Sequence, residues 1–145
     1  MMRPIRSHRL SEWLIASCGI WYIAIGIYFL FLRPTFLPED LRYLDNSLVE
    51  LRAKVPGLES WLDHVFTVAG GFMAASGTLI VYVGWVVMPL RLRGIAPLLA
   101  IAGSLSLGLM SAVNFALQSD FRWILVAPPA IWAAALLVYI AERRE

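Results

Sequence analysis

Four long apolar stretches, uncharged except for Arg122 near the start of the last one, constrain this chain more than any other feature. Because a helix needs about 20 residues to cross the hydrocarbon core of a bilayer, each stretch is long enough to span a membrane or very nearly so. We predict an all-α integral membrane protein, a four-helix bundle forming one membrane domain. The predicted spans are about 13–32, 65–90, 94–119 and 121–141.

Composition excludes several other classes of protein. The chain is 60% hydrophobic and 15% charged, whereas soluble domains have about half apolar and a quarter charged residues. A formal charge of +2 supplies no basic surface for nucleic acid. The single cysteine, Cys18, cannot form an internal disulfide or a CxxC pair. No catalytic or metal-binding motif is recognisable, so we assign no catalytic residue, no metal ligand and no evident cofactor, and we regard an enzyme as the less favoured class.

The distribution of charge predicts the orientation in the membrane, because cytoplasmic flanks and short loops are enriched in Lys and Arg. One side carries Arg3, Arg6, Arg9, Arg91, Arg93, Arg143 and Arg144 against Glu12, Glu142 and Glu145. The other side carries Arg33, Arg42, Arg52, Lys54 and Arg122 against Glu39, Asp40, Asp45, Glu50, Glu59, Asp63 and Asp120. Both termini are therefore predicted to be cytoplasmic. The first apolar run is too long for the core of a typical signal peptide, and we interpret it as an uncleaved span.

The first loop is long and contains an amphipathic pattern. Leu41, Leu44, Leu48, Leu51 and Val55 recur at spacings of three and four, which predicts an extracytoplasmic helix over about 38–54. This helix either caps the mouth of the bundle or lies in the membrane interface. Its acidic character favours capping, since interfacial helices are usually rich in Lys and Arg.

The other two loops are very short, so we predict that the second, third and fourth spans are sequential antiparallel neighbours. Pro128 and Pro129 lie inside the fourth apolar stretch. A helix starting at Pro128 would be too short to cross the bilayer alone. We therefore predict a kink at these prolines, where two backbone carbonyls lose their usual donors.

Small residues recur at helical spacing and predict close helix packing, with weak interhelical hydrogen bonds as support. A similar face in the first span contains Gly19 and Gly26. The residues predicted to pack helices in the second and third spans are Gly70, Gly71, Ala74, Ala75, Gly77, Ser104, Gly108 and Ser111. Trp21 and Trp132 fall near the middle of the membrane and are interpreted as helix-packing residues as well.

Polar residues at the outer level of the bundle are the ligand candidates. These are His64, Thr67, Asn114 and Gln118, near the prolines of the fourth span and near Tyr28. Together they could hold the head of a lipid or quinone beneath the outer helix. The alternative is that these interfacial side chains simply meet water.

The basic N-terminus, Gly19 and Gly26, the Leu37-Pro38-Glu39 segment and the glycine-rich 70–77 segment resemble the DoxX-like group of small four-helix bacterial membrane proteins. This resemblance implies an inner-membrane protein, and some relatives are described as subunits of quinone-linked oxidoreductases or partners of redox enzymes. The outer insertion at 40–63 is longer than expected for that group. No functional residue is carried over from it.

Two functions follow from the sequence. The favoured one is a non-enzymatic accessory or assembly protein of the bacterial cytoplasmic membrane, acting through helix contacts or through its outer helix. The alternative is a small lipid- or quinone-binding protein, as an oxidoreductase subunit or on its own. The expected partners are membrane lipid and either another membrane protein or a second copy of the chain, with no nucleic acid.

Overall fold

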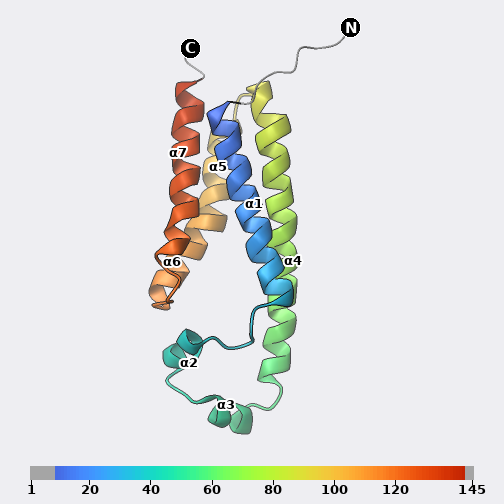
Figure 1. Cartoon of the computed structure of the whole chain (residues 1–145), viewed down its shortest axis with the longest axis vertical. Helices are drawn as coiled ribbons and strands as arrows, with labels where there is room; N and C mark the ends of the chain where they lie inside the picture. The colour runs from blue at the N-terminus through green and yellow to red at the C-terminus, as the bar shows by residue number, and fades with distance from the viewer. Residues whose placement is uncertain (1–8, 143–145) are drawn as a thin grey trace.

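A computed structural model describes residues 9–142, which fold into helices joined by short turns (Figure 1). The α-helices are α1 (Leu10–Phe31), α2 (Pro38–Leu44), α3 (Leu48–Lys54), α4 (Leu58–Tyr82), α5 (Ile95–Gly103), α6 (Leu109–Ala116) and α7 (Ala127–Ala141). Two π-helical segments are η1 (Val83–Val87) and η3 (Ser104–Gly108), and two 3₁₀ turns are η2 (Met88–Leu90) and η4 (Ile124–Val126).

Four helical runs are long and apolar enough to cross a membrane, which confirms that part of the prediction. They are Leu10–Phe31, Leu58–Leu90, Ile95–Ala116 and Ile124–Ala141. Large apolar side chains such as Phe72, Leu105 and Leu137 are about 70% exposed on these runs, as is typical of surfaces that face lipid. Arg3, Arg6, His8, Arg143, Arg144 and Glu145 lie outside the described residues.

Helix α1 is the centre of the arrangement. It packs along α4 on one side and against α7 on the other, while α5 packs against α7. The start of α1 and the end of α7 lie at one end of the bundle, which we call the proximal end; α2 and α3 lie at the opposite, distal end (Figure 1). The predicted neighbour relation between the second and third spans is wrong over most of their length, because α4 packs along α1 whereas α5 packs against α7.

The α1–α4 contact is a glycine interface formed by Gly19 and Gly26 of α1 with Gly70 and Gly77 of α4. A Cβ placed on Gly70 would lie 2.8 Å from the carbonyl oxygen of Gly26, and one on Gly77 would lie 2.7 Å from that of Gly19. Each helix presents its two glycines seven residues apart, so the antiparallel backbones meet twice, two turns apart. Small residues thus allow the two backbones to touch.

Other predicted packing residues lie elsewhere. A Cβ on Gly71 would meet nothing within 4 Å, so the predicted packing role of Gly71 is wrong within this chain. Ala75 is exposed, and Ala74 is half-buried beside Gly26. Helical periodicity explains this difference, since residues one position apart point about 100° away from each other.

The predicted small-residue stripe of the third span is also divided by the fold. Ser111 is buried, Ser104 is exposed and Gly108 is half-buried. Ser104 and Gly108 border a shallow groove against α7, beside the buried Trp132. The indole nitrogen of Trp132 donates to the Leu99 carbonyl oxygen at 2.9 Å, so this tryptophan packs between helices as predicted.

The main core fills the proximal part of the bundle. Its fully or nearly fully buried members include Ile15, Met88, Leu107, Ala135 and Tyr139. They come from α1, from the turn after α4, from the third helical run and from α7. The core therefore joins all four helical runs at one end.

A charged cluster closes the proximal end above this core. The Glu142 carboxylate accepts hydrogen bonds from the Ser11 hydroxyl and from the Arg91 guanidinium, both at 2.7 Å. Arg91 also donates to the Tyr139 carbonyl oxygen and stacks on the Tyr139 ring, with its guanidinium carbon 4.4 Å from the ring centroid. These contacts join α1, the α4–α5 turn and α7.

The predicted continuous helix over 38–54 is wrong, because the segment breaks into α2 and α3. Asp45 adopts the left-handed conformation at φ 48° and ends α2. The Ser47 hydroxyl then accepts a hydrogen bond from the Glu50 N–H at 3.2 Å and begins α3. Asp, Asn and Ser in succession bond to nearby backbone groups and so compete with a helix interior.

The predicted proline kink in the fourth span is wrong as well. Pro128 and Pro129 occupy the first turn of α7, which begins at Ala127. Proline is tolerated there because first-turn N–H groups have no helical acceptor. The one-turn 3₁₀ segment η4 precedes α7 and supplies the length that α7 alone lacks.

Candidate functional site

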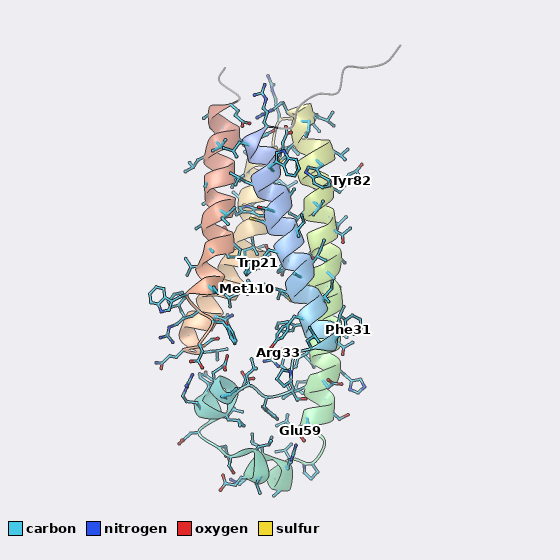
Figure 2. The ribbon with its side chains drawn as sticks, in the orientation of Figure 1. Trp21, Phe31, Arg33, Glu59, Tyr82 and Met110 are labelled. Atoms are coloured by element: carbon cyan, nitrogen blue, oxygen red, sulfur yellow. The ribbon has the colours of Figure 1, made fainter. Side chains whose placement is uncertain are left out.

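A cavity of about 380 Å³ lies at the distal end, between α1, α6 and η4 and above α2. Figure 2 shows Trp21 and Met110 at the level where α1 and α6 begin to diverge, and Arg33 near the distal end of α1. The residues that line this distal cavity are Trp21, Ile25, Tyr28, Phe29, Arg33, Leu37, Glu39, Asp40, Phe66, Met110, Asn114, Leu117, Ser119, Phe121, Ile124 and Leu125.

Most of the cavity wall is apolar or aromatic. Trp21 and Ile25 come from α1, and Met110 and Leu117 come from the α6 side. Trp21, predicted to pack between helices, is instead part of this wall and is 39% exposed. A wall of this kind suits a hydrocarbon chain or a ring system, because it offers apolar contact with few polar groups to satisfy.

The charged groups of the cavity gather at its distal floor. Arg33 follows the end of α1, and its guanidinium pairs with the Asp40 carboxylate at 3.0 Å. The guanidinium carbon also lies 3.7 Å from the centroid of the Phe66 ring, and the Arg33 side chain is only 8% exposed. Asp40 in turn accepts a hydrogen bond from the Leu37 N–H at 2.8 Å, which fixes the first turn of α2.

Glu39 is the second acidic group of the floor. It is 4% exposed, and its carboxylate accepts a hydrogen bond from the Ser119 hydroxyl at 3.1 Å. Ser119, itself 3% exposed, lies in the turn between α6 and η4. Its hydroxyl oxygen accepts from the Phe121 N–H at 3.2 Å, which fixes the hydroxyl toward Glu39.

Helix α2 is held against this turn from both sides. Glu39 contacts Ser119 inside the cavity, while Arg42 pairs with Asp120 at 3.1 Å on the exposed side. Pro38 at the start of α2 presets the backbone for a helical turn and so helps to orient the next residue. Helix α2 therefore covers the distal floor of the cavity, as the capping alternative predicts; α3 is not among the lining elements.

The four predicted ligand residues are not brought together. Asn114 lines the cavity and donates its side-chain N–H to the Met110 carbonyl oxygen at 2.9 Å. His64 and Thr67 are exposed on α4, where their side chains bond to carbonyl oxygens one turn earlier. Gln118 adopts a left-handed conformation in the turn and is also exposed. All four residues belong to the outer level of the bundle, but depth along a helix does not specify which side of the helix a residue faces.

The residues of the charged floor are not among the predicted ligand residues. The sequence places Arg33, Glu39 and Asp40 among the charges of the outer side, and Glu39 also falls in the Leu37-Pro38-Glu39 segment of the family resemblance. The available signal was their position, since Arg33 ends an apolar span and the two acids begin a helix a few residues later. Ser119 carried no comparable signal, because its partner Glu39 lies 80 residues away in the chain.

Comparisons with known proteins identify no relative of this chain. The chain matches no protein-family model, no curated protein sequence and no solved structure.

Proposed function

We propose that the protein binds a membrane amphiphile in the distal cavity, with the apolar part between α1 and α6 and the head group at the floor formed by α2. The observation that carries this proposal is the division of one cavity into a long apolar wall and a charged floor. Its volume of about 380 Å³ falls within the range of about 300–1,000 Å³ typical of small-molecule sites. A lipid or an isoprenoid quinone has the matching chemistry.

The proposal includes a location. The bias of Lys and Arg supports cytoplasmic termini, so the distal cavity would lie at the extracytoplasmic level of a bacterial inner membrane. The position of the cavity near the end of α1 agrees with a head group at the membrane surface and a tail in the hydrocarbon layer. Membership of the DoxX-like group stays a prediction from the sequence.

A second candidate is the accessory or assembly function. The observation that favours it is the free small-residue face of α4, where Gly71 meets nothing within 4 Å and Ala75 is exposed. Pairs of small residues four apart allow close approach of another membrane helix, from a partner protein or from a second copy. The geometry favours amphiphile binding over this function, because the cavity brings together side chains from several helices.

Native mass spectrometry of protein extracted from its own membranes in mild detergent tests the proposal. We expect a retained lipid or isoprenoid mass on the wild-type protein. Met110→Trp should fill the cavity and reduce that retained mass. Leu109→Trp is the matched control, because Leu109 is the adjacent residue of α6 and is 56% exposed.

Two results would contradict amphiphile binding in the cavity. One is a wild-type protein that carries no small molecule but retains a stoichiometric protein partner, which would support the accessory function. The other is equal retention of the small molecule by both tryptophan variants, with circular dichroism and gel filtration showing that each is folded. Loss of a protein partner on Gly71→Leu would then direct attention to the free face of α4.

A further inference from the structure

The Glu39 carboxylate is a buried acid on the wall of the distal cavity. It is 4% exposed. Among the described residues its hydrogen-bond partner is the neutral Ser119 hydroxyl alone, and no described cationic side chain forms an ion pair with it. A carboxylate has about four acceptor positions, so most of the accepting capacity of Glu39 is unused by the protein.

The nearby Arg33 does not neutralise Glu39, because its guanidinium is committed elsewhere. It pairs with Asp40 at 3.0 Å, and it donates to the carbonyl oxygens of Pro34 at 2.9 Å and Thr35 at 3.2 Å. The Phe66 ring covers it at 3.7 Å. Because Arg33 and Asp40 pair with each other, Glu39 is the floor acid that has no ion-pair partner among the described residues.

A buried carboxylate without an opposite charge beside it is costly, and the cost falls when a further donor group reaches it. A bound head group with an N–H or O–H donor would supply this contact, and an ammonium would also supply the opposite charge. An anionic head would instead meet the Glu39 carboxylate, and the Arg33 guanidinium that lines the cavity is already paired with Asp40. The wall also contains the Trp21 and Tyr28 rings, whose faces attract cations.

We propose that the occupant of the distal cavity is a non-anionic amphiphile whose head group donates a hydrogen bond to Glu39, either as an ammonium or as a hydroxyl. This inference rests on the proposed function and specifies its ligand class. It makes Glu39 a specificity-determining residue. Phosphatidylglycerol, fatty acids and other anionic lipids are then poor ligands of this site, and so is an oxidised quinone, whose carbonyl oxygens only accept; a quinol has the required O–H donor.

The test compares three probes with the same hydrocarbon chain: tetradecylamine, tetradecanol and tetradecyl sulfate. Each is titrated into full-length protein in phosphatidylcholine nanodiscs, and binding is measured by native mass spectrometry. Three variants are compared. Glu39→Gln removes the charge of the proposed head-group contact, and Met110→Trp identifies binding in the cavity. The control is Asp120→Asn, on the exposed side of the contact between α2 and the α6–η4 turn. Asp120 pairs with Arg42 and does not line the cavity.

We expect the amine and the alcohol to bind the wild-type protein at least about ten-fold more tightly than the sulfate. Glu39→Gln should weaken amine binding by about ten-fold or more, because it removes the charge of a charge-assisted hydrogen bond. Alcohol binding should change less, since the glutamine carbonyl still accepts. Asp120→Asn should leave all three affinities unchanged.

The proposed ligand class is overturned if the sulfate binds as tightly as the amine, or if folded Glu39→Gln keeps full amine affinity. If Glu39→Gln does not fold, Ser119→Ala replaces it. That variant keeps the carboxylate and should bind the amine at least as tightly as the wild type, and a large loss would overturn the assignment to Glu39. Absence of binding by any probe, or binding that survives Met110→Trp, would reject the cavity function itself.

Discussion

The same four helical runs form both ends of the bundle, but side chains fill the proximal end whereas the distal end contains a cavity. At the proximal end, residues of all four helical runs converge on a core with Ile15, Leu107 and Tyr139 fully buried. At the distal end, α1 contacts α4, but α6 lies across a cavity of about 380 Å³ from α1. The difference teaches that α1 has two roles, as a member of a filled core and as one wall of a hollow site.

Polar groups show the same contrast. At the proximal end Ser11 and Arg91 both donate to the Glu142 carboxylate, which pairs this acid with a cation, although Nε of Arg91 has no hydrogen-bond partner among the described residues. The distal floor combines one satisfied pair, Arg33 with Asp40, and one acid, Glu39, that the protein satisfies only in part. A buried acid that is paired with a cation contributes to stability, whereas a buried acid without one is suited to receive a donor from a ligand.

The largest expected effect comes from breaking the glycine interface that both ends share. Gly70→Ala would place a Cβ 2.8 Å from the Gly26 carbonyl oxygen, and because that neighbour is backbone we expect a loss of about 3 kcal/mol in unfolding free energy. SDS-titrated unfolding in detergent micelles measures it. Gly71→Ala is the matched control, since its Cβ would meet nothing within 4 Å. Equal stability of the two variants would show that α1 and α4 do not touch as described.

A second test asks whether the proximal core is filled and the distal region hollow. Leu107 is fully buried, whereas Leu117 lines the cavity. Leu107→Ala should cost about 2 kcal/mol, at the low end for buried leucines because burial from lipid gains little beyond packing. Leu117→Ala should cost less than about half of that, since little packing is lost beside an existing cavity. The same unfolding assay compares them, and a reversed order would overturn the contrast between the ends.

A third test uses pH to open the proximal cluster. Burial alone would raise the pKa of Glu142, but hydrogen bonds from Arg91 and Ser11 outweigh it and hold that pKa below the ordinary value of 4.5. The stability contributed by Glu142 is therefore fully present above about pH 4.5 and is lost as the pH falls through the lowered pKa. Breaking the cluster with Glu142→Gln should cost about 1.5 kcal/mol at neutral pH.

This effect is measured by comparing the unfolding free energies of the wild type and of Glu142→Gln between pH 3 and pH 7, in steps of about one pH unit. The two stability curves should converge at the acidic end. A constant difference across the range would mean that the Glu142 charge does not stabilise the proximal end.

The smallest expected effect is at the exposed distal contact. Arg42 and Asp120 form an ion pair with both side chains more than half exposed, and exposed pairs contribute about 0.2–1 kcal/mol. Arg42→Ala should therefore lower the unfolding free energy by about 0.5 kcal/mol or less, with a smaller loss in high salt. A loss above about 2 kcal/mol would show that this pair, rather than the buried Glu39–Ser119 contact, holds α2 in place.

Local patterns were sufficient to predict the four helical runs. The absence of charge over about 20 residues specifies a span because each charged group in lipid is costly. The glycines at 19, 26, 70 and 77 were recognisable as packing residues, yet their pairing was not predictable. Helical periodicity determines which residues share a face. Which two faces pack together depends on how all the helices of the bundle are arranged.

The depth of the distal site along the bundle was predictable from the sequence, but the residues that line it were not. Asn114 lines the cavity, whereas His64, Thr67 and Gln118, predicted at the same depth, do not. Arg33 and Asp40 are seven residues apart and could have been paired from the sequence. The Asp45-Asn46-Ser47 run separates α2 from α3, although the leucine periodicity continues across it.

The sequence by itself determined that this chain is helical, that four of its segments can cross a membrane, and that an amphipathic segment joins the first two. Tertiary structure alone decided that Gly70 and not Gly71 meets α1, and that Glu39 meets Ser119 across the distal cavity. The physical reason is the distance along the chain over which each interaction acts. Hydrophobicity and helix periodicity act over neighbouring residues, whereas backbone contact and the satisfaction of a buried carboxylate depend on groups that only the assembled bundle brings together.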